Sequence, residues 1–243
     1  MDAGPPRLPV DPAETAALAI ARARILDRVA RACERSSRDP AEVTLVAVSK
    51  TVPVPRLRAA VAASVELFGE NRVQDAAEKA PEVGGAHWTL VGPLQSNKAR
   101  RAVEIFESIQ TLDSVDLGRR LGRLAGEIRS TALPVLVQVN VDADPGKAGF
   151  LPEAVAVALE ELVELPHLEL GGLMTIGLLA PEPDEARPTF RRLRALSESL
   201  RGRFAGLGPA LSMGMSDDFE AAVEEGATIV RVGRALFGER PAA

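Results

Sequence analysis

The sequence predicts a single α/β domain, a TIM-type (β/α)8 barrel preceded by an extra N-terminal helix. Three observations predict this fold class. Short apolar runs rich in β-branched residues alternate with amphipathic helical patterns along nearly the whole chain, as in parallel sheets whose strands are joined by helices. Eight such runs are present, and eight strands close a barrel. The length of 243 residues is typical of one such domain, about 250 residues.

Each element is predicted from its composition and boundaries. After an opening helix over about residues 13–36, the run VTLVAVSK at 43–50 is almost continuously apolar, like a strand that is covered on both faces. Further strands are predicted at 66–71, 87–92, 108–114, 134–141, 168–177, 210–216 and 228–233. A helical pattern follows each strand. An open doubly wound sheet is the alternative fold, but no GxGxxG motif follows the first strand.

The composition excludes several classes of protein and site. One cysteine cannot form an internal disulfide, and with two histidines it offers too few ligands for a typical zinc site. With 29 Lys+Arg against 34 Asp+Glu the formal charge is −5. The chain therefore lacks the excess of basic residues that is typical of nucleic-acid-binding proteins. Arginine clusters at 119–123 and 191–194 lie on helices that also carry carboxylates, and are expected to form solvated faces.

The N-terminal segment and the hydropathy pattern indicate the cellular location. No apolar run approaches the roughly 20 residues of a membrane helix. The proline-rich residues 1–12 lack the basic flank and apolar core of a signal peptide, and are expected to form a flexible leader. We therefore expect a cytoplasmic protein without a membrane, nucleic-acid or metal partner, in which residues 13–243 form one domain.

Lys50 ends the first predicted strand, and in these barrels the chemistry lies at the carboxyl ends of the strands. By the period of two, Lys50 shares a face with Val46 and Val48. If that face looks into the barrel, burial lowers the pKa of the amine, which can then attack an aldehyde and form a Schiff base. Taken alone, Lys50 is also explained as a strand-terminal lysine that reaches solvent or pairs with a carboxylate.

The seventh and eighth predicted strands both end in glycine-containing segments. In SMGMS, Ser212 and Ser216 supply hydroxyls, Gly214 permits close backbone approach, and Ser216 is placed to cap the next helix. Arg231 and Gly233 end the eighth strand. These two loops are the usual phosphate site of such barrels, although ordinary turns explain them too. A lysine facing a phosphate site indicates a bound phosphate-bearing aldehyde, for which pyridoxal phosphate (PLP) is the obvious candidate.

At this point the sequence resembles the YggS/PROSC-type pyridoxal phosphate homeostasis proteins, relatives of the alanine racemase barrel. The resemblance extends from about Val43 to Gly238. It rests on the motifs LVAVSK, FGENRVQD, VGPLQSNK, VNVDADPGKAGF, GLMTIG, SMGMSDD and VRVGRALFG, in this order. Two positions depart from the family pattern: Arg72 stands where the family usually has tyrosine, and Thr89 where it usually has histidine.

The resemblance implies a PLP-binding barrel of fold type III and a role for each matched residue. Lys50 would carry the cofactor as a Schiff base, with Asn71 near the cofactor. The SMGMS segment and Gly233 would receive the phosphate, and Arg231 would face the pyridine nitrogen. Lys147, on the loop after the fifth strand, matches an accessory second lysine of the family; its glycine-flanked loop is expected to be flexible and exposed.

The scarcity of acid/base side chains separates a carrier from an enzyme. A PLP-dependent amino-acid racemase needs acid/base groups on both faces of its substrate. In the racemase that the fold resembles one of them is a tyrosine from a partner subunit, but this chain has no tyrosine and is expected to end with its barrel. An arginine at the pyridine nitrogen also disfavours the protonated ring.

A lysine-dependent aldolase, a third possibility, needs a further proton-transfer group that we cannot identify. We therefore expect a monomer that holds PLP for intracellular PLP homeostasis, with PLP-dependent enzymes as possible clients and no catalytic residue. The racemase remains the alternative.

Overall fold

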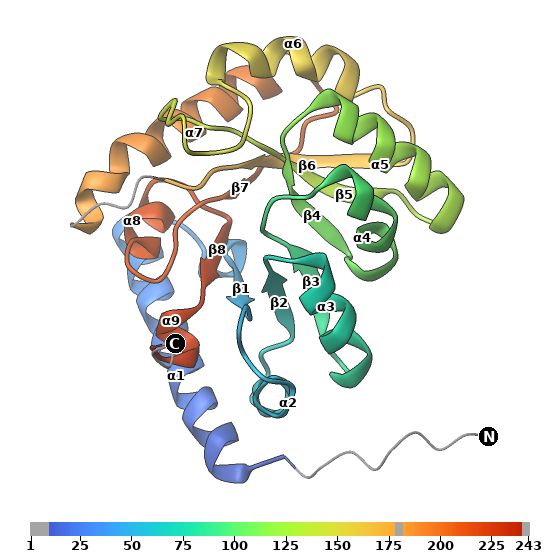
Figure 1. The fold of residues 1–243 in the computed structure, drawn as a ribbon. Coiled ribbons are helices and arrows are strands. Elements are labelled where there is room, and N and C mark those ends of the chain that lie inside the picture. The colour runs from blue at the N-terminus through green and yellow to red at the C-terminus, as the bar shows by residue number, and fades with distance from the viewer. Residues whose placement is uncertain (1–9, 178–181, 240–243) are drawn as a thin grey trace.

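Eight parallel strands close into a barrel in which each strand pairs with its neighbours in sequence and β1 pairs with β8 (Figure 1). The structure is a computed structural model that describes residues 10–177 and 182–239. The strands are β1 Thr44–Val48, β2 Leu67–Glu70, β3 His87–Leu90, β4 Ser108–Leu112, β5 Leu133–Gln138, β6 Leu168–Met174, β7 Ala210–Ser212 and β8 Ile229–Val232. The predicted barrel is thereby confirmed, and the doubly wound alternative is wrong.

Helices follow the strands and cover the outside of the barrel. They are α1 Pro12–Arg35, α2 Val54–Ala62, α3 Val73–Lys79, α4 Ala99–Ile105, α5 Val115–Ile128, α6 Pro152–Leu162, α7 Arg187–Arg201, α8 Phe219–Glu224 and α9 Arg234–Phe237. Short 3-10 turns are η1 Pro40–Glu42, η2 Ala80–Glu82, η3 Ser96–Lys98 and η4 Pro183–Ala186.

The extra N-terminal helix is α1, which runs alongside α8 and α9 and also contacts α2 (Figure 1). The Asp11 carboxylate accepts a hydrogen bond from Ala13 N (2.9 Å) and caps the helix, and Pro12 occupies its first turn, where no backbone donor is needed. The helix therefore starts one residue before the predicted domain boundary. Residues 1–9 of the predicted leader lie outside the described residues.

The core lies between the strands and the helices. In α5, Leu117, Leu121 and Leu124 recur at helical spacing and are buried against the barrel. Phe68 and Trp88 are directly paired across β2 and β3, with ring centroids 5.3 Å apart. This rigid scaffold holds the carboxyl ends of the strands, from which the site is built.

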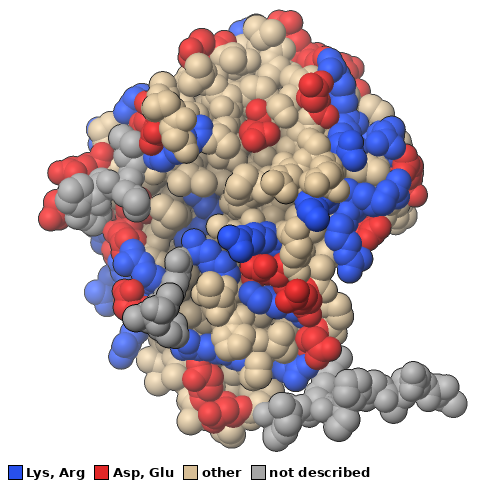
Figure 2. All heavy atoms as spheres, in the orientation of Figure 1, with Lys and Arg blue, Asp and Glu red and all other residues tan. Residues whose placement is uncertain are grey.

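Arg119, Arg123 and Arg191 are exposed, as expected for solvated faces, and carboxylates pair with both arginine clusters. The pairs are Arg119–Glu161, Arg123–Glu127 and Arg191–Glu225. Acidic and basic side chains are also mixed over the face seen in Figure 2. Within residues 10–177 and 182–239, no helix is long and apolar enough to cross a membrane, and no group of three or more His, Cys, Asp or Glu side chains could hold a metal ion.

Candidate functional site

Lys50 lies in a tight turn that follows β1. The strand ends at Val48, so Lys50 lies two residues beyond β1 and not, as the sequence predicted, at the end of the strand. Val52 N donates to Ser49 O (3.0 Å) and closes the turn around Lys50 and Thr51. Thr51 has a φ of 67°, a left-handed conformation that costs a β-branched residue about 1–3 kcal/mol. The direction of the Lys50 side chain is therefore decided by this strained turn and not by strand periodicity.

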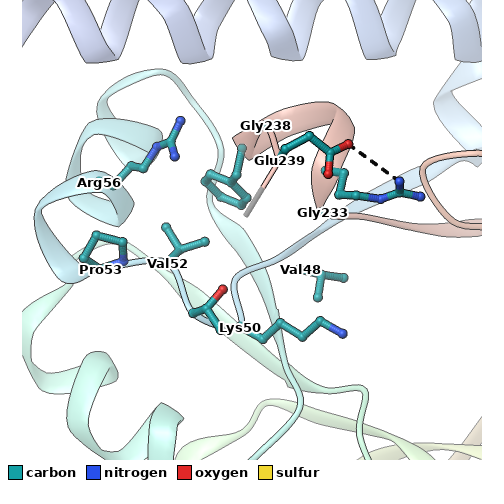
Figure 3. Close-up of a pocket in the computed structure, with 11 residues that line it drawn as sticks. Val48, Lys50, Val52, Pro53, Arg56, Gly233, Gly238 and Glu239 are labelled. Atoms are coloured by element: carbon teal, nitrogen blue, oxygen red, sulfur yellow. Dashed lines mark ion pairs between the residues drawn. The ribbon is translucent and has the colours of Figure 1, made fainter. Parts of the chain in front are cut away.

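A pocket of about 230 Å³ joins this turn to the segment after β8. Lys50 and Val48 line it from one side, and Gly233 and Phe237 line it from the other. In Figure 3 the Lys50 side chain extends below Val48 and away from Pro53. The structure thus brings together two predicted site residues from the first and the last strand.

Ser216 connects the loop after β7 to the loop after β8. Its Oγ accepts hydrogen bonds from Gly233 N (3.2 Å) and Ala235 N (3.3 Å). The prediction that Ser216 caps the helix after β7 is wrong, because α8 starts only at Phe219 and Asp218 is its N-cap residue. Two backbone N–H groups instead converge on the serine oxygen, the arrangement that binds one oxygen of an anion.

Gly214 is required for packing within the β7 loop. Its φ is 88°, and an added Cβ would lie 2.5 Å from the Ala222 Cβ. Its carbonyl oxygen accepts a hydrogen bond from Arg231 N (3.1 Å). The close backbone approach that the sequence predicted at Gly214 is therefore made to α8. β7 ends at Ser212 and is shorter than predicted, although Met213 N and Gly214 O still form hydrogen bonds to β8.

Arg231 lies inside the barrel and is almost fully buried. Its Nη1 donates to Ser212 Oγ (2.5 Å) and its Nη2 donates to Thr175 O (2.7 Å). Ser212 Oγ in turn donates to Gln110 Oε1 (2.6 Å). Burial lowers the pKa of Arg231 to about 10, against the opposing effect of the Asp218 charge, so the guanidinium is still charged at neutral pH. Ser212 and Arg231, two of the predicted site residues, are thus in direct contact.

The sequence analysis missed Gln110 and Thr175. Both are buried polar residues, Gln110 in the middle of β4 and Thr175 directly after β6. A polar residue within the run SIQTLDS was the available signal for Gln110, whereas Thr175 meets Arg231 through its backbone carbonyl, which no residue type reveals. The signal at Gln110 did not reveal which of the other strands its side chain would reach.

Asn71 directly follows β2, as predicted, and its backbone is held closely. A Cβ on Gly92 would lie 2.2 Å from Asn71 O, so only glycine allows the ends of β2 and β3 to meet here. Asn71 also borders a second cavity of about 630 Å³, which Arg72 and Lys98 line as well. The first departure from the family pattern, Arg72, therefore lies at a cavity rim beside a predicted site residue.

Thr89, the second departure, lies away from any cavity that we identify in the described part of the chain. It is buried, and its Oγ1 accepts a hydrogen bond from Ser108 Oγ (2.7 Å). Its own hydroxyl is oriented towards Ser108 O (3.2 Å). Thr89 therefore connects β3 to β4, a structural role within the barrel wall.

Lys147 is held in place, in contrast to the predicted flexible and exposed loop. Its Nζ donates to Gly177 O (2.9 Å) and lies 3.6 Å from Asp144, and its side chain is only 22% exposed. Asn140 Nδ2 donates to Asp144 O (2.8 Å) and ties the loop to the end of β5. The expectation from the flanking glycines was wrong because side-chain hydrogen bonds organise this loop.

Comparison with known proteins identifies the family. The family model described as alanine racemase, N-terminal domain, matches residues 20–241. The pyridoxal phosphate homeostasis protein of Pseudomonas aeruginosa is 43% identical over 227 residues, which cover 90% of this chain and 94% of that protein. The protein of the same name from Aquifex aeolicus is 39% identical over 219 residues, 89% of this chain and 96% of that protein. The chain belongs to the pyridoxal phosphate homeostasis protein family.

Solved structures related to this family member have the same barrel. PipY of Synechococcus elongatus with PLP bound is 40% identical, covers 88% of this chain and 100% of its own, and superposes with a TM-score of 0.77. A Bifidobacterium adolescentis protein described as unknown has a TM-score of 0.86 at 32% identity, with 94% and 98% covered. Alanine racemase of Clostridium difficile, 15% identical with a TM-score of 0.70, shares the fold over 93% of this chain and 57% of its own.

Proposed function

We propose that this protein binds PLP, attaches it to Lys50 as a Schiff base, and holds it for PLP homeostasis without turning over a substrate. The observation that carries the proposal is that Lys50 and Gly233 line one pocket. The Gly233 amide at this pocket and the Ala235 amide both donate to Ser216 Oγ. The names of the curated relatives and the PLP-bound PipY structure support it.

The residues present fit the chemical groups of PLP. The Gly233 and Ala235 amides donate to Ser216 Oγ, and a phosphate oxygen that takes the place of this acceptor would receive both donors, with the Ser216 hydroxyl as a third. Bound PLP would supply an aldehyde, which the Lys50 amine can attack. Arg231 is a donor-only group and would face an unprotonated pyridine nitrogen.

The remaining predicted residues receive more limited roles in this proposal. Asn71 is the candidate for a contact with PLP from the β2 side. Ser212 orients Arg231 through the hydrogen bond between them and does not bind the phosphate. Lys147 is kept as an accessory lysine, because the Gly177 carbonyl holds its amine at a defined position.

A carrier is favoured over a racemase because of the groups around the cofactor. An arginine at the pyridine nitrogen disfavours the protonated ring that stabilises a substrate carbanion. The chain has no tyrosine to act as the second acid/base group. We infer that the protein is a cytoplasmic monomer that buffers PLP and releases it to PLP-dependent enzymes.

Borohydride trapping tests the proposed site. The purified protein is incubated with PLP, reduced with borohydride and digested, and the labelled peptide is identified by mass spectrometry. We expect the label on Lys50 in the wild type, the loss of that label in Lys50→Ala, and its retention in the matched control Lys98→Ala. An unchanged visible spectrum in Lys50→Ala would show that the attachment site is wrong.

A second assay separates the carrier from the enzyme. The PLP-loaded protein is incubated with single enantiomers of common amino acids, and the enantiomer ratio is followed over time. We expect no change above a protein-free PLP control. Sustained racemisation that is lost in Lys50→Ala would overturn the carrier proposal in favour of the racemase.

A further inference from the structure

Ser49, the residue before Lys50, is held at every polar atom. Its N donates to Gly69 O (3.0 Å) and its Oγ donates to Glu70 Oε1 (2.9 Å). Its carbonyl oxygen accepts from Val52 N (3.0 Å) and from Lys79 Nζ (2.9 Å). The side chain is fully buried. The first residue of the turn that presents Lys50 therefore has no freedom to shift.

Glu70 and Lys79 form the ion pair that supports this arrangement. Lys79 Nζ lies 2.6 Å from Glu70 Oε1, with side-chain exposures of 13% for Lys79 and 0% for Glu70. The second carboxylate oxygen accepts a hydrogen bond from Asn71 N (3.2 Å). One carboxylate thus contacts Ser49, which precedes Lys50, and Asn71, the other predicted cofactor contact at this edge of the barrel.

The burial of this pair needs an explanation other than stability. The desolvation of two charges offsets most of their attraction, and apolar residues of similar size often stabilise a fold equally well. What an ion pair adds is direction, because both Lys79 and Glu70 have defined hydrogen-bond partners in the turn. The turn also contains Thr51, whose left-handed conformation is unfavourable and must be imposed by its surroundings.

We propose that the Glu70–Lys79 ion pair is a positioning device that fixes the turn at residues 49–52 and the start of the loop at Asn71, and so sets where Lys50 and Asn71 meet PLP. Neither charged group needs to contact the cofactor. Lys79, at the end of α3, acts through Ser49 O, and Glu70, at the end of β2, acts through Ser49 Oγ and Asn71 N. This inference rests on the proposed function of Lys50.

The test removes the pair without leaving a buried charge unpaired. The variant Glu70→Gln/Lys79→Met is compared with the wild type and with Arg58→Met. Arg58 is 15% exposed, similar to Lys79, and makes an ion pair with Glu82 (2.7 Å) that does not include Ser49. Circular dichroism and thermal unfolding establish that each variant is folded. PLP affinity and the rate of labelling at Lys50 are then measured.

We expect the double variant to bind PLP about tenfold more weakly and to label Lys50 more slowly, because a misplaced nucleophile lowers the effective concentration of the reacting groups. Arg58→Met should match the wild type in both measurements. The single variant Lys79→Arg, which keeps the positive charge and the hydrogen-bond donors opposite Glu70, should bind PLP with most of the wild-type affinity. A folded double variant with wild-type affinity and labelling rate would overturn the positioning role. A wild type that never labels Lys50 would instead overturn the proposed function.

Amide exchange provides a readout that needs no PLP. The Val52 amide, which donates to Ser49 O, should exchange about tenfold faster in the double variant, because the turn opens locally. The same amide should be unaffected in Arg58→Met. Unchanged protection of Val52 in the folded double variant would show that the pair does not hold the turn.

Discussion

Arg231 donates a hydrogen bond to Ser212 Oγ over 2.5 Å inside the barrel, where both side chains are buried. Because Ser212 donates onward to Gln110 Oε1 (2.6 Å), three strands, β8, β7 and β4, are joined by one chain of hydrogen bonds. The charged guanidinium is thereby held at a defined angle in the buried interior of the barrel. The stability and the binding properties of the protein should both reflect this chain.

Ser212→Ala should destabilise the protein by about 1–3 kcal/mol, because it leaves buried polar atoms of Gln110 and Arg231 without their partner. Denaturation in urea measures the loss. Ser212→Ala/Gln110→Leu should recover part of it, since the unsatisfied amide is gone. A loss of less than about 0.5 kcal/mol in the single variant would mean that water replaces the serine.

Ser216→Ala should weaken PLP binding by about tenfold at a cost in stability of only about 1 kcal/mol, because it removes one polar group from the proposed phosphate site. Titration monitored by the visible band measures the affinity. Ser36→Ala serves as the control, because Ser36 Oγ donates to Ala32 O (2.8 Å) on α1. That variant should lose comparable stability and keep its PLP affinity. Equal PLP affinity in both variants would contradict the proposed phosphate site.

Gly214→Ala should be clearly more destabilising than Gly238→Ala, although both glycines have left-handed φ values, 88° and 78°. An added Cβ at Gly238 meets nothing within 4 Å, so only the backbone strain of about 1–2 kcal/mol applies. At Gly214 the clash with Ala222 adds about 1–3 kcal/mol. Thermal or chemical unfolding compares the two. Equal losses would show that α8 moves away at little cost.

Asp218→Asn should gain stability relative to the wild type as the pH rises above about 4. Burial raises the pKa of Asp218 above its ordinary value of 3.8, although Met215 N and the Arg231 charge both lower it. When the pH rises through 3.8, the unfolded chain therefore loses its proton before the folded chain does, which favours unfolding. Asparagine removes this effect. Urea denaturation of both proteins between about pH 4 and pH 7 gives the difference, and a difference that does not change with pH would contradict the assignment.

The fold could be predicted from the sequence because it depends on local patterns. Apolar runs and helical spacing repeat along the chain, and every predicted strand is present, with boundaries that differ by a few residues. The joint presence of Lys50 and Gly233 at one pocket was also predictable. In a closed parallel barrel β1 and β8 are neighbours, and their carboxyl ends must lie at the same edge.

The partners of individual side chains could not be predicted. Ser216 was assigned to the helix after it in sequence, but its oxygen accepts from Gly233 N and Ala235 N, which lie 17 and 19 residues away. Lys147 was assigned to a mobile loop, but the Gly177 carbonyl, 30 residues away, holds its amine. In both cases the nearest interpretation along the chain was replaced by a contact made across the barrel.

The sequence by itself determined the eight-stranded barrel, the PLP homeostasis family, and the positions of the candidate residues at strand ends, because periodicity and short motifs are local properties of the chain. The absence of tyrosine also made a racemase unfavourable at that level. Only the tertiary structure decided how the site is supported. The link from Gln110 to Ser212 spans 102 residues, and Ser49 reaches Lys79 over 30. Such pairs depend on the register between strands and on turn dihedral angles, which no local pattern specifies.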